Sequence, residues 1–192
     1  MKMSQEKLAL LKEKKAVLEG HFILTSGRHA RTYIQCARIL QDPKATTQLI
    51  GELLKQMEYL DIDLVIGPAT GGIILAYEAA RQLEVDAIFS EREKGEMVLR
   101  RGFEIPQGAR VLVMEDVVTT GGSVMEVIRQ VEKSGGQVVA VGLLADRTGG
   151  KVDFKVPTYR VFSKEIKSYE PEKCPLCQRG IAAIRPGSRA LK

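Results

Sequence analysis

Residues 111–123 read VLVMEDVVTTGGS. The first four are apolar, a pattern typical of a strand that is buried on both faces of a parallel sheet. Glu115 and Asp116 follow at the point where such a strand would leave the sheet, and small threonine and glycine residues come next. Four aliphatic residues between positions 124 and 131 then recur at the spacing of an amphipathic helix. The segment therefore predicts a strand, an acidic pair, a turn with uncovered backbone and a helix.

This order of elements suits the binding of a phosphorylated sugar. Hydroxyl and backbone N–H groups of a Thr/Gly turn can hold a phosphate at the positive end of the helix dipole. The two carboxylates can accept hydrogen bonds from vicinal sugar hydroxyls. The chain contains no G-x-x-x-x-G-K-[ST] motif, and no G-x-G-x-x-G motif follows a predicted strand. The sequence therefore argues against the two common nucleotide-binding loops.

The whole segment resembles the signature with which type I phosphoribosyltransferases bind 5-phosphoribosyl-1-diphosphate (PRPP). The resemblance implies an α/β fold with a mostly parallel central sheet of five strands, flanked by helices, and with a small hood and a flexible flap. It implies that Glu115 and Asp116 contact the ribose and are catalytic. It also implies PRPP contacts along the rest of the turn, from Val117, Val118, Thr119, Thr120, Gly121, Gly122 and Ser123.

A second strand–turn–helix unit lies upstream, where a predicted strand at residues 63–66 is followed by GPATGG at residues 67–72. Glycine lets the backbone approach an anion closely, and the helix predicted through about Leu83 offers its N-terminus to the same anion. In the resembled family the equivalent turn grips the pyrophosphate, often through a non-proline cis peptide. The resemblance therefore adds three PRPP contacts, Ala69, Thr70 and Gly71.

The other elements follow from hydrophobic periodicity and turn signals. A first helix is expected from Ser4 to about Leu18, ended by Gly20, and a second from Ala45 to about Tyr59. Further extended segments are expected near residues 22–24, 32–36, 87–90, 137–146 and 152–162.

Residues 22–33 are similar to a run near the N-terminus of orotate phosphoribosyltransferases. That run reads Phe-x-Leu-x-Ser-Gly-(Arg/Lys) and is followed by a tyrosine, and this chain matches each position. In the family the loop helps to close the site, so the resemblance makes Arg28 an orotate contact. Many members carry a lysine just before the Ser-Gly pair, where this chain has Thr25.

Residues 90–110 are charged, contain three glycines and are too long for a tight loop between core strands. They predict a hairpin or mobile flap, with strands near residues 96–99 and 103–105. Orotate phosphoribosyltransferases place their catalytic flap here, and the resemblance assigns Arg92 and Lys94 to the departing pyrophosphate. The family's flap usually ends in His-Gly, whereas this segment contains no histidine. That departure leaves a purine or uracil open as the base.

Arg147 comes directly after the strand predicted over residues 137–146. A guanidinium group can bind a planar carboxylate through two hydrogen bonds. Orotate enzymes carry an arginine at the matching place, so the resemblance makes Arg147 an orotate contact, together with Thr119. A surface ion pair is the alternative for this arginine.

Two of the three cysteines, Cys174 and Cys177, form a C-x-x-C pair. A structural zinc site needs four ligands, and the only other cysteine and histidines are Cys36, His21 and His29. Two interpretations stay open: zinc completed across a dimer, or a reduced cysteine knuckle. The C-terminal tail, residues 163–192, contains Pro-Gly-Ser-Arg at residues 186–189 and resembles that of a subgroup of orotate phosphoribosyltransferases from thermophilic bacteria.

Length and composition suit one α/β domain over residues 1–192, with a hood from about 18–40 and 163–192 and a flap at about 90–110. The net charge of +5 fits a polyanionic small substrate, and an aromatic content of 5% argues against nucleic-acid binding by base stacking. No apolar run is long enough to cross a bilayer, and the charged N-terminus is unlike a signal peptide. We therefore expect a cytoplasmic protein without nucleic-acid or membrane partners.

The resemblance implies a reaction in pyrimidine (UMP) synthesis. The 5-phosphoribosyl group of PRPP would pass to orotate, giving orotidine 5′-phosphate and pyrophosphate. Mg²⁺ would be carried by PRPP, with no direct protein ligand. The family also implies a homodimer that shares its flap across subunits. Two alternatives are a phosphoribosyltransferase for a purine or uracil, and a PRPP-sensing regulator that has lost catalysis.

Overall fold

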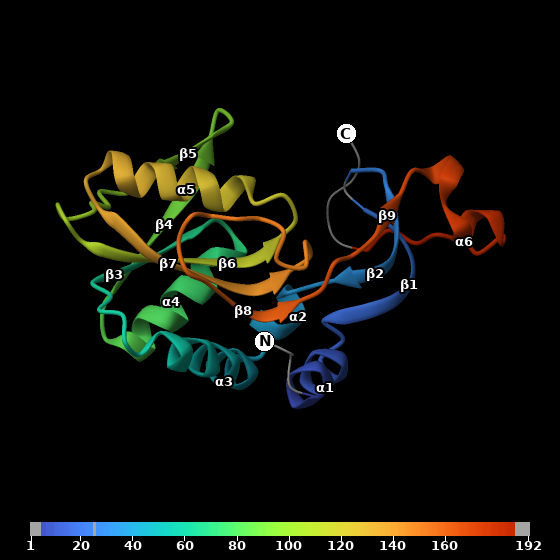
Figure 1. Cartoon of the computed structure of the whole chain (residues 1–192), viewed down its shortest axis with the longest axis horizontal. Helices are drawn as coiled ribbons and strands as arrows, with labels where there is room; N and C mark the ends of the chain where they lie inside the picture. The colour runs from blue at the N-terminus through green and yellow to red at the C-terminus, as the bar shows by residue number, and fades with distance from the viewer. Residues whose placement is uncertain (1–4, 25, 187–192) are drawn as a thin grey trace.

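The protein is described from a computed structural model that places residues 5–24 and 26–186 (Figure 1). Its larger part is a six-stranded sheet in the order β5-β4-β3-β6-β7-β8. Five of these strands are parallel, and β5 pairs antiparallel with β4 at one edge. The strands are β3 (Leu64–Pro68), β4 (Asp86–Glu93), β5 (Glu96–Leu99), β6 (Arg110–Val118), β7 (Gln137–Asp146) and β8 (Thr158–Ser163).

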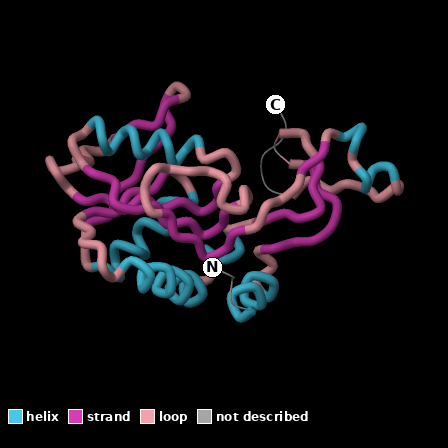
Figure 2. The backbone as a smooth tube through the Cα atoms, in the orientation of Figure 1, coloured by secondary structure: helices cyan, strands magenta, loops and turns pink. Residues whose placement is uncertain are grey.

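A second sheet, which we call the small sheet, is antiparallel and lies beyond one edge of the large sheet (Figures 1 and 2). It contains β1 (Val17–Ile23), β2 (His29–Ile34) and β9 (Ser168–Tyr169), in that order. The helices are α1 (Gln5–Glu13), α2 (Ala37–Leu40), α3 (Pro43–Leu54), α4 (Gly71–Leu83), α5 (Gly122–Lys133) and α6 (Pro175–Gln178), with short 3-10 turns at Lys55–Met57 and Pro171–Lys173. None of the helices in the described part of the chain is long and apolar enough to span a membrane.

The position of β6 in the middle of the sheet follows from its apolar residues. Leu112 and Met114 point into a core that they share with α3 and α4, whereas Val111 and Val113 point into a second core that they share with α5. Side chains alternate between the two faces of a strand, so a continuous apolar run needs helices on both sides. Figure 1 shows these layers, with α5 on one face and α3 and α4 on the other.

The parallel pairing aligns the strand ends that carry the predicted site. β3 pairs with β6, and β6 pairs with β7, all running in the same direction. The turns that follow β3 and β6 and the residue that follows β7 therefore share the carboxyl edge of the sheet, where ligands bind in parallel α/β folds. In Figure 1 the arrowheads of β6 and β7 point toward the small sheet, which stands beyond this edge.

Most predicted elements are confirmed, but the first helix is shorter than predicted. It ends at Glu13, Lys15 follows with a left-handed backbone (φ 53°), and β1 has begun by Val17. Gly20 therefore lies in β1 instead of ending a helix. The reason is long-range, because residues at the start of β1 pair with residues near the end of β2.

Two other predicted strands are wrong or too long. Residues 103–105 form no strand: Ile105 is buried in the core beneath α5, and the ring of Phe103 packs on Phe89 at 5.0 Å. The strand predicted over residues 152–162 covers only Thr158–Ser163, and residues 152–157 form a loop. The large sheet has six strands instead of five because β5 folds back on β4.

Candidate active site

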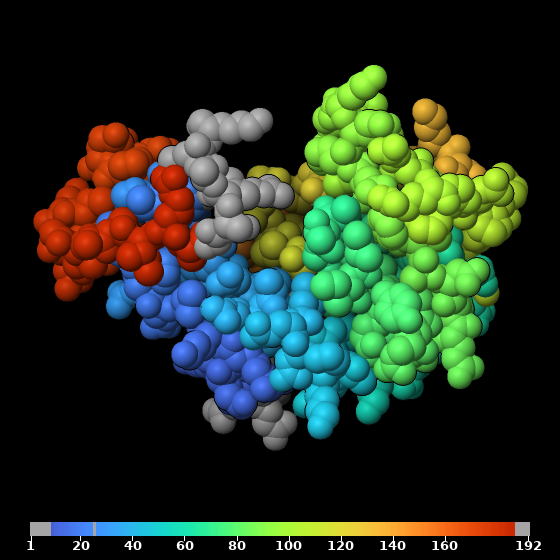
Figure 3. Space-filling model, turned by 180° about the vertical axis from the view of Figure 1, so that it is seen from behind, coloured from blue at the N-terminus to red at the C-terminus, as the bar shows by residue number. Residues whose placement is uncertain are grey.

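Two turns meet at the carboxyl edge of the large sheet, and Asp116 links them. One turn joins β3 to α4 through Ala69 and Thr70, and the other joins β6 to α5. A Cβ atom added to Gly71 would lie 2.1 Å from Oδ2 of Asp116, so only glycine permits this contact. From behind, the molecule is hollowed between the small and large sheets, and yellow atoms, the colour of the β6–α5 turn, lie at the floor (Figure 3).

Both turns leave their backbone uncovered. Ala69, Thr70, Thr119 and Thr120 are exposed, and the peptide bond between Ala69 and Thr70 is cis, as the family resemblance implied. Within the described residues, neither N-cap position, Thr70 for α4 or Gly121 for α5, supplies a side-chain hydrogen bond to its helix. The first N–H groups of both helices are therefore available to anions, and the helix dipoles favour negative charge there.

The acidic pair at the end of β6 is unusual in its burial. Glu115 is only 8% exposed, Asp116 is half-buried, and Oε1 of Glu115 accepts a hydrogen bond of 3.0 Å from the backbone N–H of Asp116. Burial first, and then the negative charge of Asp116, raise the pKa of Glu115 to about 9. A carboxyl group that holds its proton can donate a hydrogen bond to a sugar hydroxyl. Carboxylates with strongly shifted pKa values cluster at functional sites.

Cys36 supports this pair from the side of α2, a contact that the sequence did not reveal. Its Sγ donates a hydrogen bond of 3.2 Å to the backbone carbonyl of Asp116. Burial, followed by the charges of Asp116 and Glu115, raises the pKa of this thiol well above its usual range. Cys36 therefore acts as a small buried group that positions the end of β6.

Arg147 stands next to the acidic turn with an unsatisfied donor. Its backbone N–H donates to the carbonyl of Val118, the last residue of β6, at 2.9 Å. Within the described part of the chain, its Nε is the one buried side-chain nitrogen or oxygen atom that lacks a hydrogen-bond partner. Burial lowers the pKa of its guanidinium. An unpaired buried donor on a cation is costly, so this position is suited to an anionic ligand.

Asp146 holds the backbone around Arg147 in place, a role that the motifs of the sequence did not reveal. It is 1% exposed and accepts hydrogen bonds from Thr148 N (2.8 Å), Gly150 N (2.9 Å) and Arg160 Nε (2.8 Å). Burial by itself raises the pKa of this carboxyl, but the hydrogen bonds from Thr148 and Arg160 outweigh it and lower the pKa. The position of Asp146 at the end of an apolar predicted strand was the feature of the sequence that could have indicated this role.

Arg28 and Arg92 pair with residues outside these two turns, and Lys94 is exposed. Arg28 donates to Oγ and to the carbonyl of Ser168, both at 2.8 Å, and pairs with Glu170. Arg92 donates to Glu126 of α5 at 2.7 Å and to the carbonyl of Gly95. Lys94 is exposed at the tip of the β4–β5 hairpin. Each arginine is thus paired with a carboxylate of this chain.

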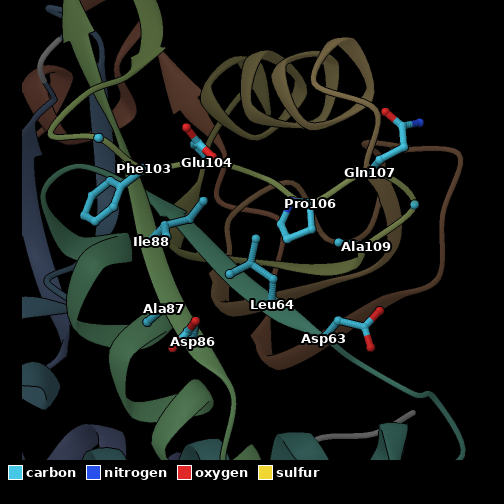
Figure 4. Close-up of a pocket in the computed structure, with 12 residues that line it drawn as sticks. Asp63, Leu64, Asp86, Ala87, Ile88, Phe103, Glu104, Pro106, Gln107 and Ala109 are labelled. Atoms are coloured by element: carbon cyan, nitrogen blue, oxygen red, sulfur yellow. The ribbon is translucent and has the colours of Figure 1, made fainter.

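A cavity of about 590 Å³ lies at the opposite edge of the large sheet, around the amino ends of β3 and β4 (Figure 4). Its acidic residues include Asp63, which accepts hydrogen bonds from the backbone N–H of Arg110 at 2.8 Å and from its guanidinium at 3.0 Å. Ligands of parallel α/β sheets bind at the carboxyl ends of the strands. We therefore place the candidate site at the two turns and not in this cavity.

A family of known proteins matches most of this chain. Residues 37–175 match the family described as the phosphoribosyl transferase domain, a range that contains both turns and Arg147. The chain belongs to the phosphoribosyltransferase family.

Within the phosphoribosyltransferases, the chain is similar to proteins named orotate phosphoribosyltransferase. The protein from Caldanaerobacter subterraneus subsp. tengcongensis is 54% identical over 190 residues, which are 98% of this chain and 100% of that protein. The one from Thermotoga maritima is 50% identical over 183 residues, 95% of this chain and 98% of that protein. A crystal structure of orotate phosphoribosyltransferase from Aeropyrum pernix has a TM-score of 0.67 at 30% identity, covering 80% of this chain and 91% of that chain.

The phosphoribosyltransferase fold is shared by enzymes named for other bases. A crystal structure of adenine phosphoribosyltransferase from Rhodothermus marinus has a TM-score of 0.65 at 24% identity and covers 83% of this chain and 99% of that chain. Backbone similarity therefore does not distinguish one base from another, and side chains must select the base.

Gly71→Ala should impair PRPP binding without unfolding the protein. The added Cβ would lie 2.1 Å from Oδ2 of Asp116, so that carboxylate must move away from the turn. We expect binding of the PRPP–magnesium complex, measured by calorimetry, to weaken at least about ten-fold, or about 1.4 kcal/mol. Gly51→Ala is the matched control, because its Cβ meets only the flexible Gln82 side chain. Equal affinities of the two variants would contradict the contact.

Glu115→Gln should change how the stability of the ligand-free protein depends on pH. The pKa of Glu115 is about 9 in the folded state, against an ordinary value of 4.5. The stability linked to its proton is complete below pH 4.5 and is lost as pH rises towards 9, because the unfolded chain ionises first. The melting temperature of Glu115→Gln relative to the parent should therefore increase between pH 5 and pH 8.

The control for this pH series is Glu132→Gln, which alters an exposed carboxylate on α5. Its melting temperature should follow that of the parent at every pH. A Glu115→Gln curve that also runs parallel to the parent would show that Glu115 is ionised in the folded protein.

Proposed function

We propose that this chain transfers the 5-phosphoribosyl group from PRPP to orotate, giving orotidine 5′-phosphate and pyrophosphate, in pyrimidine (UMP) synthesis. The observation that carries the choice of base is the buried, unpartnered Nε of Arg147 beside the acidic turn. Orotate carries a carboxylate that can pair with this guanidinium, whereas uracil and the purines carry none. Relatives named orotate phosphoribosyltransferase, at 54% and 50% identity over nearly the full length, support the same base.

In this proposal each of the two turns binds a different part of PRPP. Backbone N–H groups and hydroxyls of Thr119–Ser123 hold the 5′-phosphate at the N-terminus of α5, and the Ala69–Gly71 turn holds the pyrophosphate at the N-terminus of α4. Glu115 and Asp116 lie between them and bind the ribose hydroxyls. The contact between Gly71 and Asp116 keeps the ribose and pyrophosphate subsites in register.

The acidic pair also supplies the electrostatic part of the chemistry. The bond between C1′ and the pyrophosphate oxygen loosens before the orotate nitrogen reaches C1′, so positive charge develops on the ribose ring. The negative charge of Asp116 stabilises that charge, and the backbone that carries it is positioned by its hydrogen bonds to Glu115 and Cys36. Glu115, whose buried carboxyl holds its proton, donates a hydrogen bond to a ribose hydroxyl. Arg147 orients orotate through its carboxylate, with Thr119 at the adjoining turn.

Magnesium fits this site as part of the substrate. Among the described residues, the carboxylates at the two turns do not gather into a group of three or more metal-binding side chains. Mg²⁺ retains several waters and binds readily through substrate phosphates, so it would be carried by the pyrophosphate and ribose oxygens of PRPP with no direct protein ligand. When bound, Mg²⁺ neutralises charge on the pyrophosphate. The protein's own contribution is to hold the ribose and the two anionic groups in position.

We also propose that the small sheet forms a hood over the turns and that residues 90–110 act as a flap within a homodimer. Lys94 is exposed at the tip of the β4–β5 hairpin, where it is accessible to a neighbouring subunit. On α4, Ile74 and Tyr77 are 44% and 67% exposed and lie three residues apart on one face. Exposed apolar side chains on one face favour a protein interface.

A panel of bases tests the proposed reaction. Pyrophosphate release from PRPP and magnesium should occur with orotate and not with uracil, adenine or hypoxanthine. Arg147→Ala should raise the KM for orotate at least about ten-fold and leave the KM for PRPP nearly unchanged, because only the contact with the base carboxylate is lost. The control is Arg110→Ala, which removes an exposed arginine paired with Asp61 and Asp63 at the opposite edge.

Turnover of a purine or uracil in place of orotate would favour the alternative base. Binding of PRPP without turnover of any base would favour a regulator. Equal effects of Arg147→Ala on both KM values would remove this arginine from the base pocket.

Co-expression of two defective chains tests the shared flap. Asp116→Asn and Lys94→Ala should each be nearly inactive alone. If the flap serves the partner, one of the two sites in every mixed dimer has an intact acidic pair and an intact flap, so about a quarter of all sites should recover. No recovery in a mixture shown to be dimeric by light scattering would place the flap over its own chain's site.

A further inference from the structure

Four side chains that commonly bind metals meet in the small sheet, away from the candidate active site. His21 lies on β1 and His29 on β2, whereas Cys174 and Cys177 come from the tail, at the start and within the short helix α6. Their four ligand atoms all lie within 4.8 Å of one another. His21 and Cys174 are 153 positions apart in the sequence, so only the fold brings the two pairs together.

We propose that these four side chains form a structural zinc site within a single chain. Zn²⁺ in such sites is tetrahedral, with distances of about 2.0 Å to nitrogen and 2.3 Å to sulfur, which place neighbouring ligand atoms about 3.3 to 3.8 Å apart. Here Nε2 of His21 lies 2.9 Å from Nδ1 of His29 and 3.4 Å from Sγ of Cys174. Sγ of Cys177 lies 3.2 Å from Nδ1 of His29 and 3.7 Å from Nε2 of His21.

A hydrogen bond outside the cluster orients His21 as a ligand. Its Nδ1 lies 2.7 Å from the backbone carbonyl of Ile181, which can only accept, so Nδ1 carries the proton. The lone pair of Nε2 then points at Nδ1 of His29 and at the two sulfur atoms. Metal-binding histidines commonly donate their second ring nitrogen to a carbonyl in this manner.

Burial distinguishes this cluster from a chance meeting of surface side chains. His21, His29 and Cys174 are 3%, 8% and 0% exposed, and Cys177 is exposed. Three ligands are therefore shielded from water, and the fourth gives the ion a path of entry. Four protein ligands leave no open coordination position, which is the property of a structural site.

One chain supplies all four ligands, so zinc needs no second subunit to complete its site. The two interpretations of the cysteine pair left open by the sequence are thus replaced by a third. In this third interpretation the two histidines on the β1–β2 hairpin complete the site. They are far from the cysteines in the sequence, so the sequence did not indicate that the four residues lie together.

The ion would join the tail to the β1–β2 hairpin. Without it, the tail is attached through short contacts: β9 has two residues, and Ile184 exchanges backbone hydrogen bonds with His21 (2.8 Å) and Ile23 (2.9 Å). The hairpin loop between the two histidines carries Arg28, which is bonded to Ser168 of β9. Zinc would therefore stabilise the small sheet as one unit beyond the carboxyl edge of the large sheet.

Metal analysis of the full chain tests the site directly. The chain purified from zinc-supplemented cells without chelator should contain one zinc per chain. Cys177→Ser should lose this zinc, whereas Cys36→Ser, which alters the one cysteine outside the cluster, should retain it. Cobalt replacing zinc should give the visible absorption of a tetrahedral thiolate site in the parent and in Cys36→Ser only.

A second measurement on the parent protein makes the test independent of how the variants fold. Removing zinc with a chelator should lower the melting temperature by about 5 to 10 °C, and adding zinc, but not magnesium, should restore it. A parent protein that binds neither zinc nor cobalt would overturn the proposal. So would zinc that remains bound, in folded protein, after both Cys177→Ser and His29→Ala.

Discussion

The contact between Gly71 and Asp116 is the constraint on which the candidate site depends. It requires glycine at the start of α4, because a Cβ atom there would lie 2.1 Å from the carboxylate. With glycine at this position, the turn after β3 and the turn after β6 form one surface. The N-termini of α4 and α5, which have no side-chain cap, face the same region. Parallel pairing of β3 with β6 makes this approach possible, since both strands end at the same edge.

The ionisable groups at this edge lower the stability of the ligand-free protein. Glu115 is buried beside Asp116, and Nε of Arg147 is buried without a partner. Neither arrangement stabilises the protein in the absence of ligand, because a carboxyl group buried beside a negative charge and an unpaired buried donor are both unfavourable. The surroundings compensate through fully bonded groups such as Asp146, which accepts hydrogen bonds from two backbone N–H groups and from Arg160. A polyanionic sugar and an anionic base are the ligands that would satisfy both sets of groups.

The small sheet is a separate unit beyond the carboxyl edge of the large sheet. The chain has structural counterparts in enzymes named for orotate and for adenine, which cover 80% and 83% of it. The small sheet has few core residues of its own, and the polar cluster of His21, His29, Cys174 and Cys177 lies where a larger sheet would have an apolar core. Small units with little core are commonly stabilised by metals or disulfides. The proposed zinc would serve that purpose here.

Local sequence determined the central β6–turn–α5 unit and the unit around β3 and α4, because apolar periodicity and turn chemistry act over a few residues. Tertiary structure alone decided the rest. Pairing with β2 placed Gly20 in a strand, and carboxylates distant in sequence or on another element paired with Arg28 and Arg92. The proposed metal ligands likewise meet across 153 positions. Such contacts depend on how strands and helices pack, which periodicity along the chain does not encode.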